Sequence, residues 1–113
     1  MYKKPYLLII FLSLLFSGCG QPIGGEIFFN QINALEDSIS HTDWEETKLQ
    51  MDELIKIYEE TLWKLQLLGD EGEYEGLHES LERLKPAVDQ EDKLQALLEL
   101  ATIKGYLEGI YSM

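Results

Sequence analysis

Apolar residues along most of this 113-residue chain recur every three or four positions, with acidic and polar residues between them. This spacing places the apolar side chains on one face of a helix, and no stretch shows the sustained alternation that is typical of a strand. Proline, glycine and polar clusters divide the pattern into four predicted helices, at about residues 26–39, 43–68, 73–85 and 90–111. Because the connections are short, successive helices should run antiparallel. The predicted fold class is all-α, an up-and-down antiparallel bundle of three to four helices.

The predicted helix over 43–68 has the clearest boundaries and the widest apolar surface. Thr42 and Glu45 have the spacing of a capping box, which satisfies backbone amides at the start of a helix, and Gly69 is a residue type that ends helices. The apolar arc is wider than one neighbouring helix would cover, so we expect this helix to pack against at least two others. The arc contains Trp44, Met51, Leu54, Ile55, Ile57, Tyr58, Leu62, Leu65 and Leu68.

Each of the other three helices has one predicted apolar face. Pro86 lacks the backbone N–H that a helix interior needs, so it should kink or end the third helix. Asp89 is a suitable N-cap for the fourth helix. The faces consist of Phe28, Ile32, Leu35 and Ile39 in the first helix, of Tyr74, Leu77, Leu81 and Leu84 in the third, and of Leu94, Leu97, Leu98, Ala101, Leu107 and Ile110 in the fourth.

Residues 1–18 have the composition of an export signal. Lys3 and Lys4 form a positively charged end, and the apolar run over 5–16 is shorter than the roughly 20 residues that a membrane-spanning helix needs. The sequence "FSGC" that follows resembles the bacterial lipobox, with Phe16 in place of the more usual leucine.

The resemblance to a lipobox gives the only cysteine of the chain, Cys19, a role. It implies that Cys19 carries a diacylglyceryl and palmitate lipid anchor and becomes the first residue of a mature lipoprotein at the extracytoplasmic face of the cell membrane. The alternative is that Cys19 is an ordinary residue of an uncleaved membrane anchor. In the favoured interpretation, 1–18 are the signal peptide, 19–25 are the lipidated cysteine with a flexible tether, and 26–113 are an acidic helical-bundle domain.

The chain is strongly acidic, with 21 acidic and 9 basic residues and a formal net charge of −12. Without Lys3 and Lys4, seven basic residues face 21 acidic ones, so the predicted mature protein has a net charge of −14. This charge repels phosphate groups, which argues against nucleic-acid binding. A protein partner in the cell envelope should therefore present a basic patch.

Few residues of the chain suggest site chemistry. Glu75 and His78 form one Glu-x-x-His, the pattern that places two metal ligands one helical turn apart in carboxylate-bridged bundles. The sequence has no second copy, and a solvated surface position for His78 is the alternative. The acidic runs "DWEE", "GDEGEYE" and "DQED" could bind a hard cation or could be solvated helix ends. No nucleophile has a catalytic context, so we expect no enzyme activity, no metal site and no cofactor.

Trp63 points away from the main apolar face of its helix, and Leu49 and Leu67 lie in nearly the same direction. Two interpretations are open. In the first, the helix over 26–39 covers this second stripe. In the second, the three residues form an exposed patch that contacts a partner.

The helical part of the chain also resembles a known family. Its features are Asp43-Trp44 at the start of the long helix, Trp63 nineteen residues after Trp44, the segment "SLERLKPAVDQED" and a leucine-rich final helix, together covering about Thr42 to Ile110. They resemble a family of small membrane-anchored proteins of unknown function from Gram-positive, often spore-forming bacteria. The resemblance implies a location and a fold but no activity.

Two hypotheses for the function follow. The favoured one is a lipid-anchored, non-enzymatic binding or scaffolding module for a membrane or envelope partner. The alternative is a cation- or small-ligand-binding lipoprotein that uses its surface carboxylates.

Overall fold

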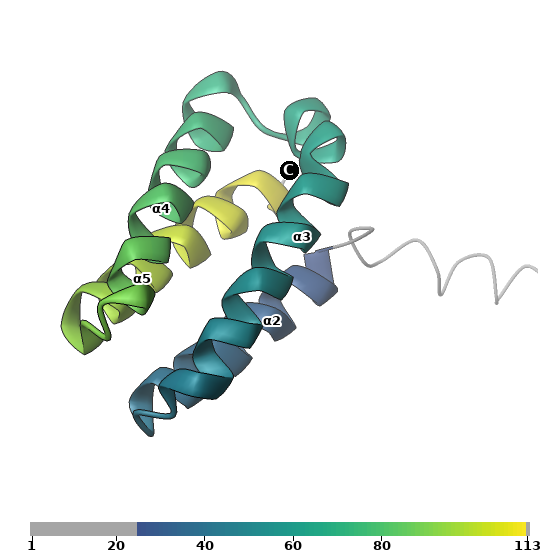
Figure 1. The fold of residues 1–113 in the computed structure, drawn as a ribbon. Coiled ribbons are helices and arrows are strands. Elements are labelled where there is room, and N and C mark those ends of the chain that lie inside the picture. Colours follow the sequence, from purple (N-terminus) through teal and green to yellow (C-terminus); the bar gives the residue numbers. More distant parts are fainter. Residues whose placement is uncertain (1–24, 113) are drawn as a thin grey trace, which may run out of the picture.

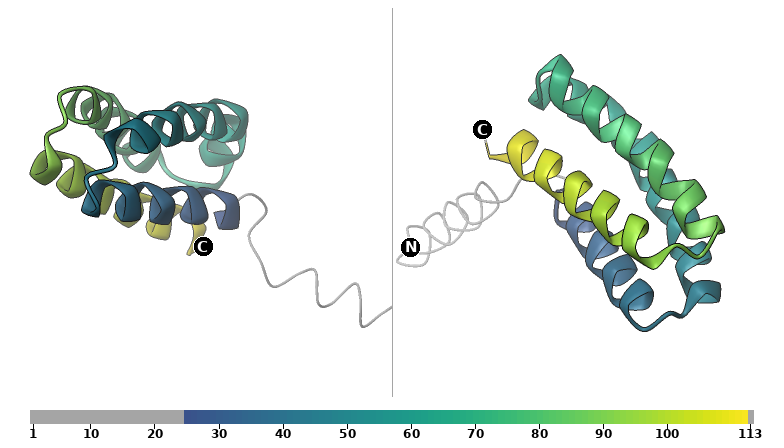
Figure 2. Two further views of the ribbon diagram at one scale, coloured as in Figure 1. Left: turned by 60° about the horizontal axis from the view of Figure 1, so that its bottom comes forward. Right: turned by 90° about the vertical axis from the view of Figure 1, so that its left-hand side faces the viewer.

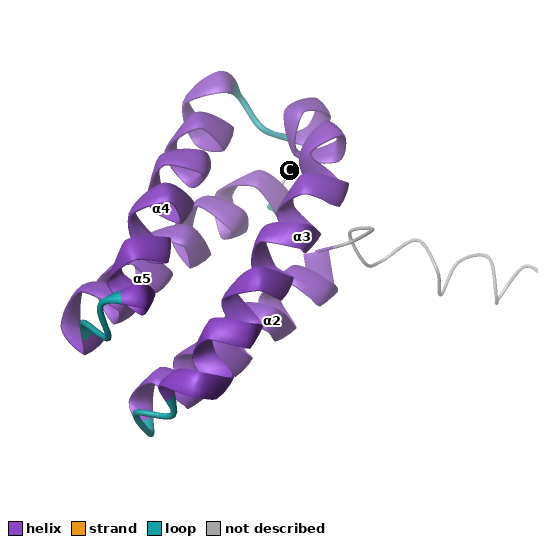
Figure 3. Ribbon diagram, in the orientation of Figure 1, coloured by secondary structure: helices purple, strands orange, loops and turns teal. Residues whose placement is uncertain are grey.

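The computed structural model describes residues 25–112, which form four helices (Figure 1). The helices are α2 (Gly25–Ser40), α3 (Trp44–Leu68), α4 (Glu71–Asp89) and α5 (Lys93–Tyr111). Short turns connect them, and this part of the chain contains no strand (Figure 3). The prediction of an all-α helical bundle is therefore confirmed. The predicted signal peptide and Cys19 lie outside the described residues.

Successive helices run antiparallel and form two hairpins, α2–α3 and α4–α5, which pack against each other (Figure 2). The α4–α5 pair is the most extensively packed, followed by α2–α3, whereas α3 and α4 meet over a smaller area. The turns of both hairpins lie at one end of the bundle, and the α3–α4 connection lies at the other (Figure 1). None of the helices in the described residues combines the length and the apolar character that crossing a bilayer requires.

The core lies between the four helices and confirms the predicted apolar face of α2 and most of that of α3, in which Leu68, at the end of the helix, is exposed and not part of the face. All four predicted positions of α2 are fully buried. Helix α3 contacts α2 on one side and α4 on the other, as its wide apolar arc predicts. The buried apolar residues of the core are Phe28, Ile32, Leu35, Ile39, Met51, Leu54, Ile57, Tyr58, Leu65, Leu77, Leu81, Leu84, Ala87, Val88, Ala96, Leu100, Ile103, Leu107 and Ile110.

The two hairpin turns share one backbone geometry. Thr42 and Glu91 have positive φ angles of 55° and 56°, and each follows a helix whose last carbonyls accept bonds from the turn. In the first turn Asp43 N–H donates to Ser38 O at 2.9 Å, and in the second Asp92 N–H donates to Ala87 O at 2.9 Å. These are Schellman motifs in which the left-handed residue is not glycine. The aspartate after each turn is then the N-cap of the next helix.

These turns correct two predicted caps. Asp43, not Thr42, caps α3 by accepting a bond from Glu46 N–H, because Thr42 is occupied by the left-handed turn. Asp92, not Asp89, caps α5, because α4 continues to Asp89 before turning. The predicted stop at Gly69 is confirmed.

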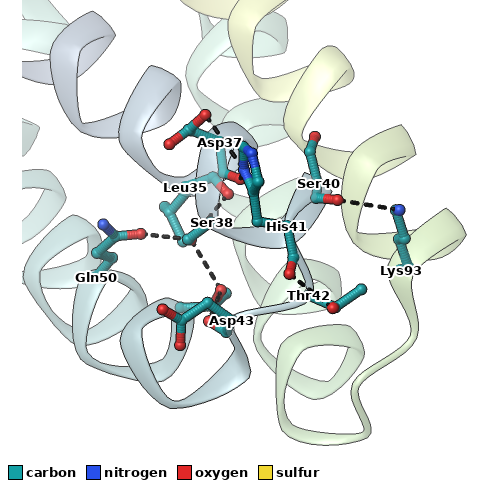
Figure 4. Close-up of polar contacts among 10 residues, drawn as sticks. Leu35, Asp37, Ser38, Ser40, His41, Thr42, Asp43, Gln50 and Lys93 are labelled. Atoms are coloured by element: carbon teal, nitrogen blue, oxygen red, sulfur yellow. Dashed lines mark hydrogen bonds and ion pairs between the residues drawn. The ribbon is translucent and has the colours of Figure 1, made fainter.

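Contacts between the two turns fix the hairpins to each other. Lys93 Nζ of α5 donates to Ser40 O at the end of α2, at 3.2 Å (Figure 4). Lys48 Nζ of α3 lies 3.2 Å from Glu91 Oε2 in the second turn. Beneath the first turn, the buried Ser38 Oγ lies 2.6 Å from Gln50 Oε1, which ties α2 to α3 (Figure 4).

Helix α4 is longer at both ends than predicted, and Pro86 lies inside it. The proline removes only the bond from its own nitrogen to the Glu82 carbonyl. Both residues lie on the exposed side of the helix, where water can replace that bond. Packing of Ala87 and Val88 into the core stabilises the last turn beyond the proline.

The predicted apolar face of α5 is largely wrong. Leu94 and Leu98 are 71% and 54% exposed. Leu97 is half-buried and Ala101 is exposed, so only Leu107 and Ile110 of the predicted face are buried. The buried face instead contains Ala96, Glu99, Leu100, Ile103, Leu107 and Ile110.

Candidate functional site

A groove of about 580 Å³ lies between α3 and α4, where the two helices meet over a small area. This volume is within the range of ligand sites in proteins. A second hollow of about 420 Å³ continues it and shares Tyr58, Leu62 and His78 with it. We call the two together the α3–α4 groove. It is lined by Ile55, Tyr58, Glu59, Leu62 and Gln66 of α3 and by Tyr74, Glu75, His78, Glu79, Leu81, Glu82, Lys85 and Pro86 of α4.

The floor of the α3–α4 groove is apolar. Leu81 and the Tyr58 ring are buried, and Ile55 and Leu62 are half-buried beside them. On α3 these positions follow one another at intervals of three and four residues, which is the spacing of a helix–helix seam. The α3 side of the groove is therefore a seam that α4 fills only in part.

Three polar side chains form a chain of contacts across the groove. Tyr58 Oη lies 3.2 Å from His78 Nδ1, and His78 Nε2 lies 3.0 Å from Glu82 Oε1. With a neutral imidazole, one tautomer satisfies all three groups: the phenol donates to Nδ1 and Nε2–H donates to the carboxylate. The rings of Tyr58 and His78 also stack at a tilt, with their centroids 5.8 Å apart. This series of contacts therefore orients the Glu82 carboxylate at the edge of the groove.

Burial raises the pKa of Tyr58 above its ordinary value of 10.0, and the negative charge of Glu82 raises it further. Both causes act against the phenolate, because an anion is poorly solvated in the groove floor and is repelled by a carboxylate. Tyr58 thus keeps its proton and acts as a hydrogen-bond donor. This is the opposite of the shift that would make it a nucleophile or a general base.

The rim of the groove is acidic on both sides. Glu59 contributes from α3, and Glu75, Glu79 and Glu82 follow one another along α4. Lys85 is the one lysine or arginine among the described residues that line the groove, and its Nζ lies 4.0 Å from Asp52 Oδ1 of α3. The arrangement suits a ligand that is apolar in its centre and positively charged at its sides.

The structure leaves the stripe that contains Trp63 uncovered by the first helix, and contact with a partner stays a prediction. Trp63, Leu67 and Leu49 are 59%, 76% and 65% exposed, so the first helix does not cover them. Trp63 is one helical turn from Glu59 and from Gln66, both of which line the groove, so it borders the groove on the α3 side.

Leu49 lies fourteen residues before Trp63, about 21 Å along the helix at 1.5 Å per residue. It does not form one patch with Trp63. Leu67 lies four residues after Trp63 and does extend its exposed surface.

The Glu-x-x-His pattern places its two residues in the groove, where His78 contacts Tyr58 and Glu82. Within residues 25–112, the histidine, cysteine, aspartate and glutamate side chains form no cluster of three or more that could hold a metal ion. The other histidine, His41, lies in the first turn with its Nδ1 2.8 Å from Asp37 O (Figure 4).

The sequence did not reveal the contact between Tyr58 and His78, which lie on different helices. One signal pointed to it: His78 lies four residues after Tyr74 and three before Leu81, so it borders the apolar face of its helix. A histidine at such a border can reach a side chain of the neighbouring helix, but only the docking of α3 on α4 selects Tyr58 as its partner.

Comparison with known proteins gives a family but no activity. No curated protein and no solved structure matches the chain significantly. The family described as "Domain of unknown function (DUF4363)" matches residues 26–113, which include nearly all of the helical bundle and the whole α3–α4 groove. The chain therefore belongs to the DUF4363 family.

Proposed function

We propose that this protein is a lipid-anchored, extracytoplasmic binding module without catalytic activity, and that its α3–α4 groove holds a basic protein partner in the cell envelope. The observation that carries this proposal is the composition of the groove, an apolar floor between acidic rims. Trp63 and Leu67 extend the apolar surface beyond the rim on α3. Exposed aromatic side chains of this kind often dominate the energy of an interface.

The polar groups of the groove favour binding over catalysis. Tyr58 and Glu82 each contact one ring nitrogen of His78, and the raised pKa of Tyr58 keeps its phenol protonated. Among the described residues that line the groove, there is no serine, threonine or cysteine that the histidine could activate. The role that these groups can fill is to orient a carboxylate toward a positively charged partner.

The proposed anchor is the lipid on Cys19, supported by the lipobox-like sequence "FSGC". Replacing Cys19 with alanine should abolish lipid labelling and release the protein from the detergent-extracted membrane fraction. Unchanged labelling and partitioning would contradict the anchor, without affecting the groove.

The binding proposal is tested by crosslinking and affinity capture from membranes with the full-length protein. Wild type is compared with Trp63→Ala and with Leu98→Ala, a control that removes an exposed apolar side chain from α5. We expect Trp63→Ala to lose a captured envelope protein that wild type and Leu98→Ala retain, and we expect high salt to weaken that capture. If no protein is captured specifically, or if Trp63→Ala retains every partner, the proposal is wrong.

The volume of the groove favours a second candidate, a small-ligand-binding lipoprotein. About 580 Å³ is enough for a compact organic molecule, and the acidic rim would select a cationic one. In that case a small organic cation, and not a protein, would raise the melting temperature of the wild-type protein. It would not raise that of a variant in which an apolar side chain of the groove floor is shortened.

A further inference from the structure

We infer that the occupant of the α3–α4 groove is a short, basic amphipathic helix of the partner protein, about three turns long. This inference rests on the proposed function of the groove as a binding surface. It adds the conformation, the length and the charge pattern of the partner segment.

The dimensions of the groove set the length of the segment. On α3 the lining runs from Ile55 to Gln66, eleven steps along the helix or about 17 Å. An incoming helix of about eleven residues would cover this distance. Its apolar side chains at intervals of three and four residues would lie between Ile55 and Leu62 on one side and Leu81 on the other.

The surroundings favour a helix over an extended segment. An extended peptide gains its main-chain hydrogen bonds by adding to the edge of a sheet, and residues 25–112 contain no strand. Two antiparallel helices with a half-filled seam instead offer the ridges and grooves into which a further helix packs. The incoming helix would satisfy its own backbone and need only side-chain complementarity.

The charges along α4 set the polarity of the partner. Glu75, Glu79 and Glu82 lie on the same side of the helix at spacings of four and three residues. A partner helix with lysines or arginines at the same spacing can pair with all three. Lys85 lies three residues beyond Glu82, at the far end of this row, so the basic residues of the partner should lie opposite Glu75 to Glu82 and stay away from Lys85.

His78 gives one of these glutamates a fixed orientation. Its Nε2 lies 3.0 Å from Glu82 Oε1, while 68% of the Glu82 side chain stays accessible. A carboxylate that is already held in place loses less side-chain entropy on pairing with a cation. Glu82 is therefore the anchor on the α4 side, as Trp63 is on the α3 side.

The test uses a fluorescently labelled twelve-residue peptide of leucine and lysine, about as long as the groove, with its leucines on one helical face. A control peptide has the same composition, with the leucines distributed around the helix. The full-length protein is held in zwitterionic nanodiscs, and empty nanodiscs serve as the blank. We expect the patterned peptide to bind about tenfold or more tightly than the control peptide, since apolar anchors add to the charge attraction.

Two variants locate the binding. Leu62→Ala should weaken binding of the patterned peptide about tenfold, while Leu98→Ala should leave its binding unchanged. Glu82 is exposed, so its replacement by glutamine should leave folding unaffected. Glu82→Gln should weaken binding of the patterned peptide about threefold, while Glu108→Gln on α5 should not. Circular dichroism and thermal melting identify a variant that has lost its fold. If Leu62→Ala has lost its fold, the comparison of Glu82→Gln with Glu108→Gln tests the inference.

Equal binding of the two peptides, or equal effects of Leu62→Ala and Leu98→Ala, would overturn the inference, because the peptide would then be held by net charge alone. Competition separates this failure from that of the proposed function. If the full-length protein captures an envelope partner that the patterned peptide does not displace, the binding module stands and the helix inference is wrong. If it captures no partner, the proposed function is wrong whatever the peptide does.

Discussion

Helix α4 meets α5 through small residues and meets α3 through large ones. At the α4–α5 interface a side chain at Gly76 would overlap the Tyr106 ring, and one at Gly109 would lie 2.6 Å from Glu73 Oε2. At the α3–α4 interface, by contrast, the position of Leu62 carries a large side chain that is only half-buried. Glycine lets two helices approach closely, whereas bulky side chains along a seam keep them apart. We therefore attribute the groove to the size of the residues that α3, α4 and α5 contribute to these two interfaces.

The polar groups at the two interfaces differ in the same way. Glu99 of α5 is only 7% exposed, and its Oε1 accepts bonds from Arg83 Nε at 2.9 Å and from Gln95 Nε2 at 3.0 Å. Removing those donors would leave a buried carboxylate unpaired. In the groove, by contrast, His78 and Glu82 remain more than half exposed. One polar cluster joins the helices in the interior, and the other lines the open groove.

The largest expected effect on stability comes from truncating a leucine of the buried core, and it is compared with truncating a leucine of the groove. Leu84→Ala, at a fully buried position of α4, should lower the free energy of unfolding by about 2–5 kcal/mol. Leu62→Ala in the groove should lower it by about 1 kcal/mol, because the side chain is already half in water. Urea unfolding measures both. Equal losses would mean that α3 and α4 close over the groove in solution.

A glycine at the α4–α5 interface and an exposed glycine of α5 should respond in opposite directions to alanine. Gly76→Ala must displace the Tyr106 ring and should destabilise the protein by about 1–3 kcal/mol. Gly105→Ala meets no atom within 4 Å and should stabilise it by about 0.5–1 kcal/mol, because alanine is the better helix former. Thermal melting of the two variants provides the check. Stabilisation by Gly76→Ala would show that α4 and α5 are not in close contact.

The hydrophobic pattern predicted those parts of the fold in which a helix has a single apolar stripe. The faces of α2 and α3 follow from such stripes. Helix α5 carries leucine, isoleucine, alanine or tyrosine on nearly every side, so periodicity did not select one face. The stripe that the structure buries, Ala96, Leu100, Ile103, Leu107 and Ile110, is one of several with helical spacing, and Glu99 is buried beside it with its Oε1 accepting a bond from Arg83 Nε.

Local rules were also ambiguous where several residues could fill one role. Thr42 and Asp43 are both suitable N-caps, as are Asp89 and Asp92, and the left-handed turns at Thr42 and Glu91 decided between them. The exposed state of Trp63 was one of two predicted alternatives. The α3–α4 groove could not be predicted, because it depends on how closely two helices approach, and that distance is set by residues from three helices.

Alkaline pH should test the groove through Tyr58. Its folded pKa is raised above the unfolded value of 10.0, so its contribution to stability is fully present below pH 10 and is lost as the pH rises through the folded pKa. Tyr58→Phe should remove that part of the alkaline loss, and at neutral pH it should destabilise the protein by about 0.5–1.5 kcal/mol through the lost bond to His78. Urea unfolding at several pH values, compared between wild type and Tyr58→Phe, measures both effects. An identical alkaline loss in the two proteins would mean that Tyr58 is solvated and that the groove floor is open.

The smallest expected effect separates the two causes of that raised pKa. Glu82→Gln removes the negative charge but leaves the burial, which is the larger cause, so the pKa of Tyr58 should fall toward 10.0 without reaching it. Tyr111 is the internal control, because burial alone raises its pKa and Glu82 has no part in it. Spectroscopic titration of the phenols in wild type, Glu82→Gln and Tyr58→Phe assigns the change to one tyrosine. The stability of Glu82→Gln should stay within about 0.5 kcal/mol of wild type, as is usual for an exposed position. A pKa of Tyr58 that does not move would place Glu82 away from the phenol in solution, and Glu82 would then lose its assignment as the oriented carboxylate of the groove.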